Sequence, residues 1–196
     1  MFKKLALIVG VLLAIAAVVI ATRPSQYTVV RSLLINAPVE TAYGFVFDFH
    51  KWSTWSPWDH LDPTMQRTYR GAPAGVGAIY EWVGNDQVGS GRMTIADAKP
   101  PTAIGITLEF LKPFESTART EFQFEVTPEG TKVSWKMIGE NNFVGKFFSL
   151  VVNMEQMIGG DFERGLQALK VATEAADRAT PTPSVEANHP SADAGM

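Results

Sequence analysis

The sequence predicts an α+β fold, with an antiparallel sheet of about seven strands, a long C-terminal helix and one transmembrane helix in front. Three features predict it: an unbroken apolar run near the N-terminus, a central series of β-branched and apolar segments separated by turn residues, and a final stretch with apolar residues at helical spacing. We therefore expect a transmembrane anchor or signal-anchor at residues 1–24, a globular domain at 25–178 and a disordered tail at 179–196.

The apolar run extends from Leu5 to Ala21, contains no charged residue and follows Lys3 and Lys4. A membrane-spanning helix needs roughly 17–25 such residues, so this run is at the short end of the range. A cleaved secretory signal is the alternative, since Ala14 to Ala16 forms a small-x-small site. Cleavage there would leave part of the run behind, so an uncleaved anchor is favoured.

Charge and composition bound the location and the partners of the domain. The two lysines before the apolar run favour a cytoplasmic N-terminus, which places the domain in the periplasm or outside the cell. A net charge of −3 gives no reason to expect nucleic acid as a partner. The absence of cysteine excludes a lipoprotein anchor, a disulfide and a thiol nucleophile. The sequence does not determine the oligomeric state.

The globular part begins with a strand at residues 26–35, which is rich in β-branched and apolar residues. Pro38 and Glu40 then start a helix that runs to about Phe47, because proline is tolerated in the first turn and an acidic residue favours the helix N-terminus. A second short helix or turn follows and ends at Ser56-Pro57.

Six further strands are expected, at residues 66–70, 78–83, 89–98, 103–110, 116–127 and 131–138. The last two form a hairpin around Pro128-Glu129-Gly130. Their alternation places one set of side chains on a dry face, namely Phe122, Phe124, Val126, Val133, Trp135 and Met137.

The last element is a helix expected from Phe143 to about Ala176. Gly159 and Gly160 interrupt its apolar pattern, and each costs about 1 kcal/mol relative to alanine in a helix. A kink at this pair is therefore expected.

Three tryptophans, Trp52, Trp55 and Trp58, lie in the short polar stretch FHKWSTWSPWDHLDP at residues 49–63. Tryptophan is large and carries one N–H donor, so such a cluster is rarely left on a solvated loop. The rings either fill one end of the core or line the entrance of a site for a hydrophobic molecule.

The order of elements and three sequence blocks resemble a known superfamily. The blocks are INAPVETAYGFVFDFHKWSTWSPW at residues 35–58, LDPTM at 61–65 and GVGAIYEWVGNDQVGSGRMTI at 75–95. Over about residues 27–176 the chain resembles the START-like (SRPBCC) superfamily, in its polyketide cyclase/dehydrase and lipid-transport group, and the subgroup with an N-terminal membrane segment. The resemblance implies a helix-grip fold, in which a curved sheet wraps around the long helix and leaves a cavity. This superfamily includes carriers, cyclases, hydrolases and hormone receptors, so fold alone does not settle activity.

The residues available for catalysis are few. His50 and His60 flank the tryptophans and lie near aspartates, so a general acid–base pair is one alternative. We expect no metal site, since no ligand spacing of a known kind occurs, and no cofactor. The favoured interpretation of both histidines is that they are surface residues, so an enzyme is not favoured.

The apolar residues fit a binding protein better. Methionine and aromatic side chains suit irregular apolar pockets. The candidates for lining a cavity are Trp52, Trp55, Trp58, Tyr80, Trp82, Met93, Phe110, Phe122, Trp135, Met137, Met154, Met157 and Ile158. The alternative is that each of them packs in the hydrophobic core and contacts no ligand.

The leading hypothesis is a membrane-anchored, non-catalytic domain that binds a hydrophobic small molecule or lipid. The alternatives are a cyclase- or dehydratase-type enzyme that uses His50 or His60, and an envelope interaction module with a filled core. About five residues separate Ala21 from Gln26, which reach roughly 17 Å when extended, so the domain is held against the lipid surface.

Overall fold

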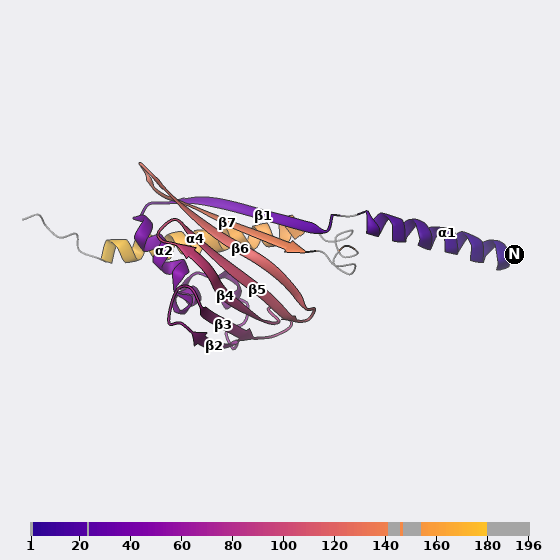
Figure 1. Ribbon diagram of the computed structural model, residues 1–196, viewed down its shortest axis with the longest axis horizontal. Helices are drawn as coiled ribbons and strands as arrows, with labels where there is room; N and C mark the ends of the chain where they lie inside the picture. Colours follow the sequence, from indigo (N-terminus) through magenta and orange to yellow (C-terminus); the bar gives the residue numbers. More distant parts are fainter. Residues whose placement is uncertain (1, 23, 141–145, 147–153, 180–196) are drawn as a thin grey trace, which may run out of the picture.

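The fold is known from a computed structural model, which describes residues 2–22, 24–140, 146 and 154–179 (Figure 1). The elements are α1 (Phe2–Ala21), β1 (Gln26–Ile35), α2 (Val39–Phe47), the 3-10 helices η1 (Phe49–Thr54) and η2 (Pro57–His60), β2 (Gln66–Gly71), β3 (Ala78–Val83), β4 (Ser90–Lys99), β5 (Ala103–Lys112), β6 (Ser116–Thr127), β7 (Gly130–Glu140) and α4 (Met154–Ala179). The predicted fold class is confirmed.

The described strands form one antiparallel sheet in the order β1-β7-β6-β5-β4-β3-β2. Helix α4 lies along β1, while α2 covers β6 and β7 and η1 reaches β3 (Figure 1). We call the face that these helices cover the inner face. It holds the core, and the opposite outer face carries ion pairs such as the one between Arg92 and Glu109.

The predicted alternation is correct through most of the sheet. Phe122, Phe124 and Trp135 are buried on the inner face. Val126 is the exception, since its side chain is 72 % exposed. Val126 is the last inner-face position of β6 before the turn, and the tip of this hairpin projects beyond the helices that cover the sheet (Figure 1).

The glycine pair does not end the helix, because α4 continues through Gly159 and Gly160. Gly159 instead allows a close approach: a Cβ atom there would lie 2.1 Å from Nη2 of Arg31. The Arg31 guanidinium therefore rests on the helix and pairs with Glu155 and Glu163 at 2.8 and 2.6 Å. The start predicted for this helix, and the predicted disordered tail beyond Ala179, lie outside the described residues.

Helix α1 is, among the described residues, the one helix long and apolar enough to cross a membrane. Most of its described side chains are exposed, so it is not a core helix of the domain. A transmembrane anchor and a signal sequence both have these properties.

Candidate functional site

The tryptophan run folds back onto α2 through 3-10 helices. The Asp48 carboxylate caps η1 by accepting the His50 backbone N–H at 2.9 Å. The indole N–H of Trp52 donates to the Val46 carbonyl at 3.0 Å, and that of Trp55 donates to the Phe45 carbonyl at 3.2 Å. Their side chains are 2 % and 0 % exposed. Both rings are therefore part of the core, with their one polar group bonded inside the protein.

Trp135 of β7 is the centre of an aromatic cluster that joins the sheet to α4. Its ring stacks on Phe162 of α4 at a centroid distance of 4.0 Å and on Phe122 of β6 at 4.8 Å. Trp55 and Trp58 meet it edge-on at 5.6 and 5.8 Å. Trp58 is only partly buried, so it closes the rim of this cluster. We call these five residues, with Trp52, the central aromatic cluster.

Two small or polar neighbours fix the position of Trp135. Its indole N–H donates to the Thr120 hydroxyl at 3.1 Å. A Cβ atom on Gly165 of α4 would lie 2.8 Å from Cζ3 of Trp135 and 3.1 Å from Cδ of Pro57. Glycine at this position therefore allows α4 to pack directly against the Trp135 ring.

A row of inner-face residues crosses the sheet near the end where β1 begins. Successive cross-strand partners give its order, which is Tyr27, Gly139, Ala118, Leu108, Met93 and Tyr80. We call it the Tyr27–Tyr80 row. Two adjacent residues of this row, Gly139 and Ala118, are small, and the Tyr27 ring lies over Gly139. The neighbouring row, closer to the same end, contains Phe110, Gly91 and Trp82.

The other predicted lining residues divide into three groups. Met137 is buried on the inner face, and Ile158 packs against the core while partly exposed. Met157 is 53 % exposed, so its side chain lies away from the core. The Met154 side chain lies outside the described part of the chain. Ligand contact by any candidate remains a prediction.

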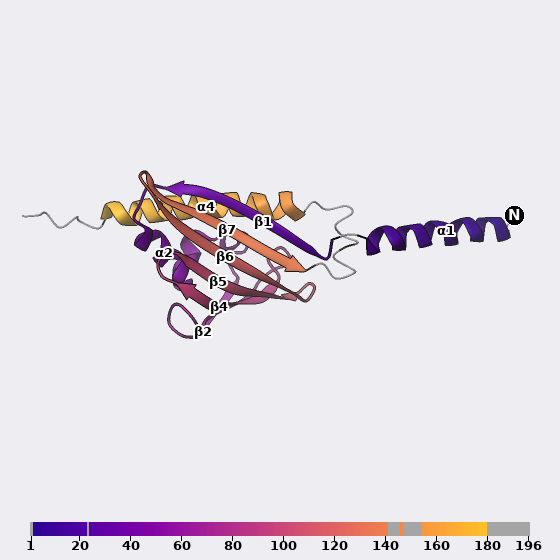
Figure 2. The ribbon, with the colours of Figure 1, turned by 45° about the horizontal axis from the view of Figure 1, so that its top comes forward.

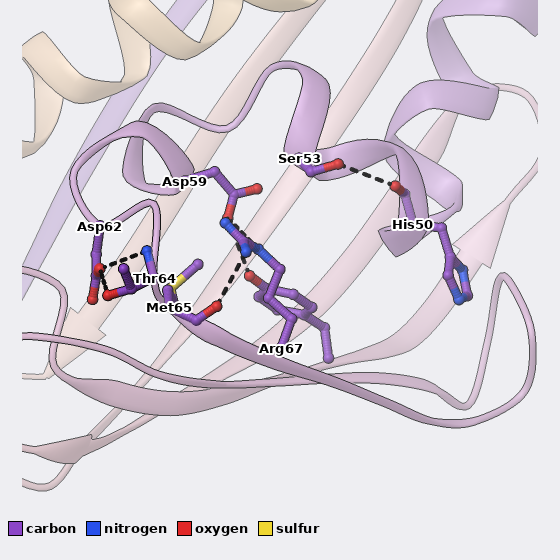
Figure 3. Close-up of polar contacts among 8 residues, drawn as sticks. His50, Ser53, Asp59, Asp62, Thr64, Met65 and Arg67 are labelled. Atoms are coloured by element: carbon purple, nitrogen blue, oxygen red, sulfur yellow. Dashed lines mark hydrogen bonds and ion pairs between the residues drawn. The ribbon is translucent and has the colours of Figure 1, made fainter.

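A polar cluster lies beneath the tryptophan run, between η2 and the β2–β3 edge (Figure 3). Asp59 is only 7 % exposed, and its Oδ1 accepts bonds from Arg67 at 3.0 Å and from the Tyr80 hydroxyl at 3.4 Å. Burial, followed by the nearby Asp59 charge, raises the pKa of Tyr80. The tyrosine therefore stays protonated and can donate to the carboxylate. This cluster was not predicted, because Arg67 and Tyr80 reach Asp59 from the strands β2 and β3, and no local pattern indicates which strands lie beside η2.

Asp62 has a structural role beside it. Its carboxylate accepts the Thr64 hydroxyl at 2.7 Å and backbone N–H groups of Thr64 and Asn85 at 2.9 and 2.7 Å. These hydrogen bonds, that of the Thr64 hydroxyl first, lower the pKa of Asp62. The charged carboxylate thus holds the β3–β4 turn against the loop that precedes β2.

The described side chains place no histidine on the inner face, where a general acid–base group would have to meet a ligand. His50 is exposed, stacks on Tyr69 at 4.2 Å and contacts the Asp48 carboxylate at 3.0 Å. The His60 side chain lies outside the described ones. Among the side chains that are described, no three His, Cys, Asp or Glu residues lie together in a way that could hold a metal ion.

A groove of about 820 Å³ lies at the end of the sheet next to the linker that follows α1. Thr107, Arg119 and Ile138 line it and alternate with inner-face residues, so the groove is on the outer face. Ser25 from the linker and Gln26 from the start of β1 line it, together with Glu115 and Ser116, where β6 begins at Ser116. Most of the residues that line it are polar, and Ala118 of the Tyr27–Tyr80 row lines it as well.

Comparison with known proteins places the fold. The model of the family described as polyketide cyclase / dehydrase and lipid transport matches residues 26–174. No curated protein matches the chain.

Solved structures match at low sequence identity. A Mesorhizobium loti protein is 16% identical with a TM-score of 0.57, and the match covers 77% of this chain and 99% of that one. The Aha1 dimer from Colwellia psychrerythraea is 15% identical with a TM-score of 0.54, covering 76% and 96%. The di-domain ARO/CYC StfQ from the steffimycin biosynthetic pathway is 12% identical with a TM-score of 0.58, covering 77% of this chain and 51% of StfQ. At these identities the likeness shows the fold alone.

Proposed function

The chain belongs to the polyketide cyclase/dehydrase and lipid transport family, and on that basis we propose that it is a membrane-anchored START-like domain that binds a hydrophobic small molecule or lipid without catalysis. The binding space would lie between the inner face and α4, over the Tyr27–Tyr80 row. The observation that carries the proposal is the make-up of this row, where small residues form the floor and adaptable apolar side chains form the walls.

The two halves of the inner face differ in a way that favours this position. The central aromatic cluster is closed by rings in contact, and three of its indole N–H groups have partners within the protein. Ala118 has almost no side chain of its own to fill the space above it, while the Tyr27 ring covers its cross-strand neighbour Gly139. Leu108 is the cross-strand neighbour of Ala118, Met93 lies one strand further along the row, and Met137 precedes Gly139 by two residues on the same face. Methionine adjusts its shape to an irregular ligand at small cost.

The short linker supports a membrane location for the domain. Helix α1 ends at Ala21 and β1 starts at Gln26, so the chain between them spans at most roughly 17 Å. With Lys3 and Lys4 on the cytoplasmic side, the domain would stand on the periplasmic or outer surface. A hydrophobic ligand would then have a short path between lipid and the inner face.

The test is mass spectrometry of hydrophobic molecules that co-purify with the full chain in mild detergent. Ala118→Leu would fill the floor of the site, and Thr117→Leu is its matched control, because Thr117 pairs with Glu109 on the outer face whereas Ala118 pairs with Leu108 on the inner face. We expect a co-purifying hydrophobe with the wild type and with Thr117→Leu, and its loss with Ala118→Leu.

A thermal melt of each variant separates loss of binding from loss of folding. If Ala118→Leu keeps the wild-type amount of hydrophobe, the site is not over this row. If the wild type carries no hydrophobic molecule, ligand binding is refuted. The interaction module with a filled core is then favoured, and the packing of the central aromatic cluster is the observation in its support.

A further inference from the structure

The end of β5 and the turn that leads to β6, residues 111–115, which we call the β5–β6 turn, carry two exposed apolar side chains that the proposed ligand site does not use. Leu111 is 52 % exposed and Phe114 is 63 % exposed. Lys112 lies between them and is also exposed. Two large apolar side chains thus lie within four residues of each other, beyond the last β5–β6 pair of Phe110 and Ser116.

The position of this turn links it to the membrane anchor. Glu115 of the turn and Ser116 directly after it line the same groove as Ser25 of the linker and Gln26 at the start of β1. Figures 1 and 2 both show the β5–β6 turn at the end of the sheet that faces α1. The turn is thus held close to the point at which the chain leaves α1.

We propose that the β5–β6 turn inserts Leu111 and Phe114 into the lipid–water interface of the membrane that α1 spans. This second contact point would fix the orientation of the domain on the surface. The inference rests on the proposed membrane anchoring and goes beyond ligand binding. The occupant is a lipid surface because the short linker already brings this end of the sheet to one.

The chemistry of the turn suits an interface rather than the hydrocarbon core. The polar backbone of a turn cannot enter the core without partners, so only the two side chains enter below the headgroups. Lys112 can extend its ammonium to lipid phosphates while its methylene groups lie along the apolar boundary.

Two contacts at one end of the sheet also orient the proposed ligand site. Phe110 precedes this turn and belongs to the inner-face row beside the Tyr27–Tyr80 row. Docking of the turn would therefore hold that part of the inner face next to the bilayer, whereas the β6–β7 turn at the opposite end would point away from it (Figure 2).

The absence of cysteine makes a direct test straightforward, because a single introduced cysteine is the only labelling site. The full chain with Phe114→Cys, or with Leu111→Cys, is labelled with a nitroxide and reconstituted into phospholipid vesicles. Electron paramagnetic resonance then compares label accessibility to O2, which concentrates in lipid, and to a water-soluble nickel chelate. Two control sites are Val11→Cys in the apolar helix and Glu129→Cys in the β6–β7 turn.

We expect the labels at 111 and 114 to shift towards O2 accessibility, as at 11, and the label at 129 to favour the nickel chelate. If 111 and 114 behave like 129 while 11 is lipid-exposed, the turn does not dock, although the anchor and the ligand site stand. If 11 is exposed to nickel as well, the membrane anchoring itself is wrong. If the labels at 111 and 114 are shielded from both reagents, a protein partner covers the turn and the lipid proposal fails.

Discussion

Replacing Trp55 by alanine separates the two interpretations of the tryptophan run, a core filler or the entrance of a ligand site. The ring is fully buried and lies 4.6 Å from the Trp52 ring, 6.1 Å from Phe122 and 5.6 Å from Trp135 by centroid. Its N–H also bonds the Phe45 carbonyl. Trp55→Ala therefore removes a ring from the middle of a packed cluster and leaves a carbonyl without its partner.

The expected cost follows from comparable changes in packed cores. Replacing a buried tryptophan by alanine costs about 3–5 kcal/mol, because apolar burial is lost and a cavity remains. For a domain of this size, each kcal/mol lowers Tm by about 2–4 °C, so Tm should fall by about 6–20 °C. Trp58 is only partly buried and has ring contacts with Trp135 and Phe162, so Trp58→Ala should cost about 1–3 kcal/mol.

The assay is thermal unfolding of the full chain in one detergent, followed by circular dichroism, with the content of bound hydrophobe measured on the same samples. Wild type, Trp55→Ala and Trp58→Ala form the series. If Trp55→Ala costs less than about 1 kcal/mol and removes the bound molecule, Trp55 lines a ligand site and its assignment to the core is wrong. If the two variants are equally destabilised, the distinction drawn between the buried ring and the rim ring fails.

Further predictions concern packing, pH and the histidine. Gly165→Ala should lower the free energy of unfolding by about 1–3 kcal/mol, because the added Cβ meets the Trp135 ring, although alanine is the better helix former. Gly160→Ala, where the nearest atom is the end of a flexible side chain at 3.7 Å, should raise it by about 0.5–1 kcal/mol; urea unfolding compares the two. The native fold lowers the pKa of Asp62 below its ordinary value of 3.8, so its contribution is present above that pH and is lost as pH falls below it. Asp62→Asn should therefore be less stable than wild type near pH 7, with a difference that narrows as the pH falls below 3.8, and a constant difference would contradict this. His50→Ala should leave the amount of bound hydrophobe unchanged, and a loss would support the histidine alternative.

The strands and their faces could be predicted because the information is local. Ile104, Ile106 and Leu108 alternate with polar residues, and the structure buries all three. The same alternation places Glu109 on the outer face, where it pairs with Arg92. It failed at Val126, since alternation gives the face of a residue and not whether a covering helix extends far enough to bury it.

Contacts between remote segments could not be read from local patterns. Nothing near Asp59 indicates that Arg67 and Tyr80 would surround its carboxylate. Gly159 and Gly160 looked like a weak point of the helix. A glycine is needed at position 159 because the guanidinium of Arg31, a residue of β1, packs against the helix there. In both cases the deciding partner is set by the sheet order and by the path of α4.

The attachment of α4 to the sheet does not depend on the proposed ligand space. The helix is held by the stacking of Phe162 on Trp135 and by the ion pairs of Arg31 with Glu155 and Glu163. None of these groups belongs to the Tyr27–Tyr80 row. A molecule over that row could therefore leave for the adjacent bilayer without detaching the helix. Removal of the bound hydrophobe should then lower the free energy of unfolding only by the free energy of binding, and Tm should fall accordingly. Unfolding should remain a single cooperative transition. A separate early transition in the ligand-free protein would instead mean that the ligand is part of the core.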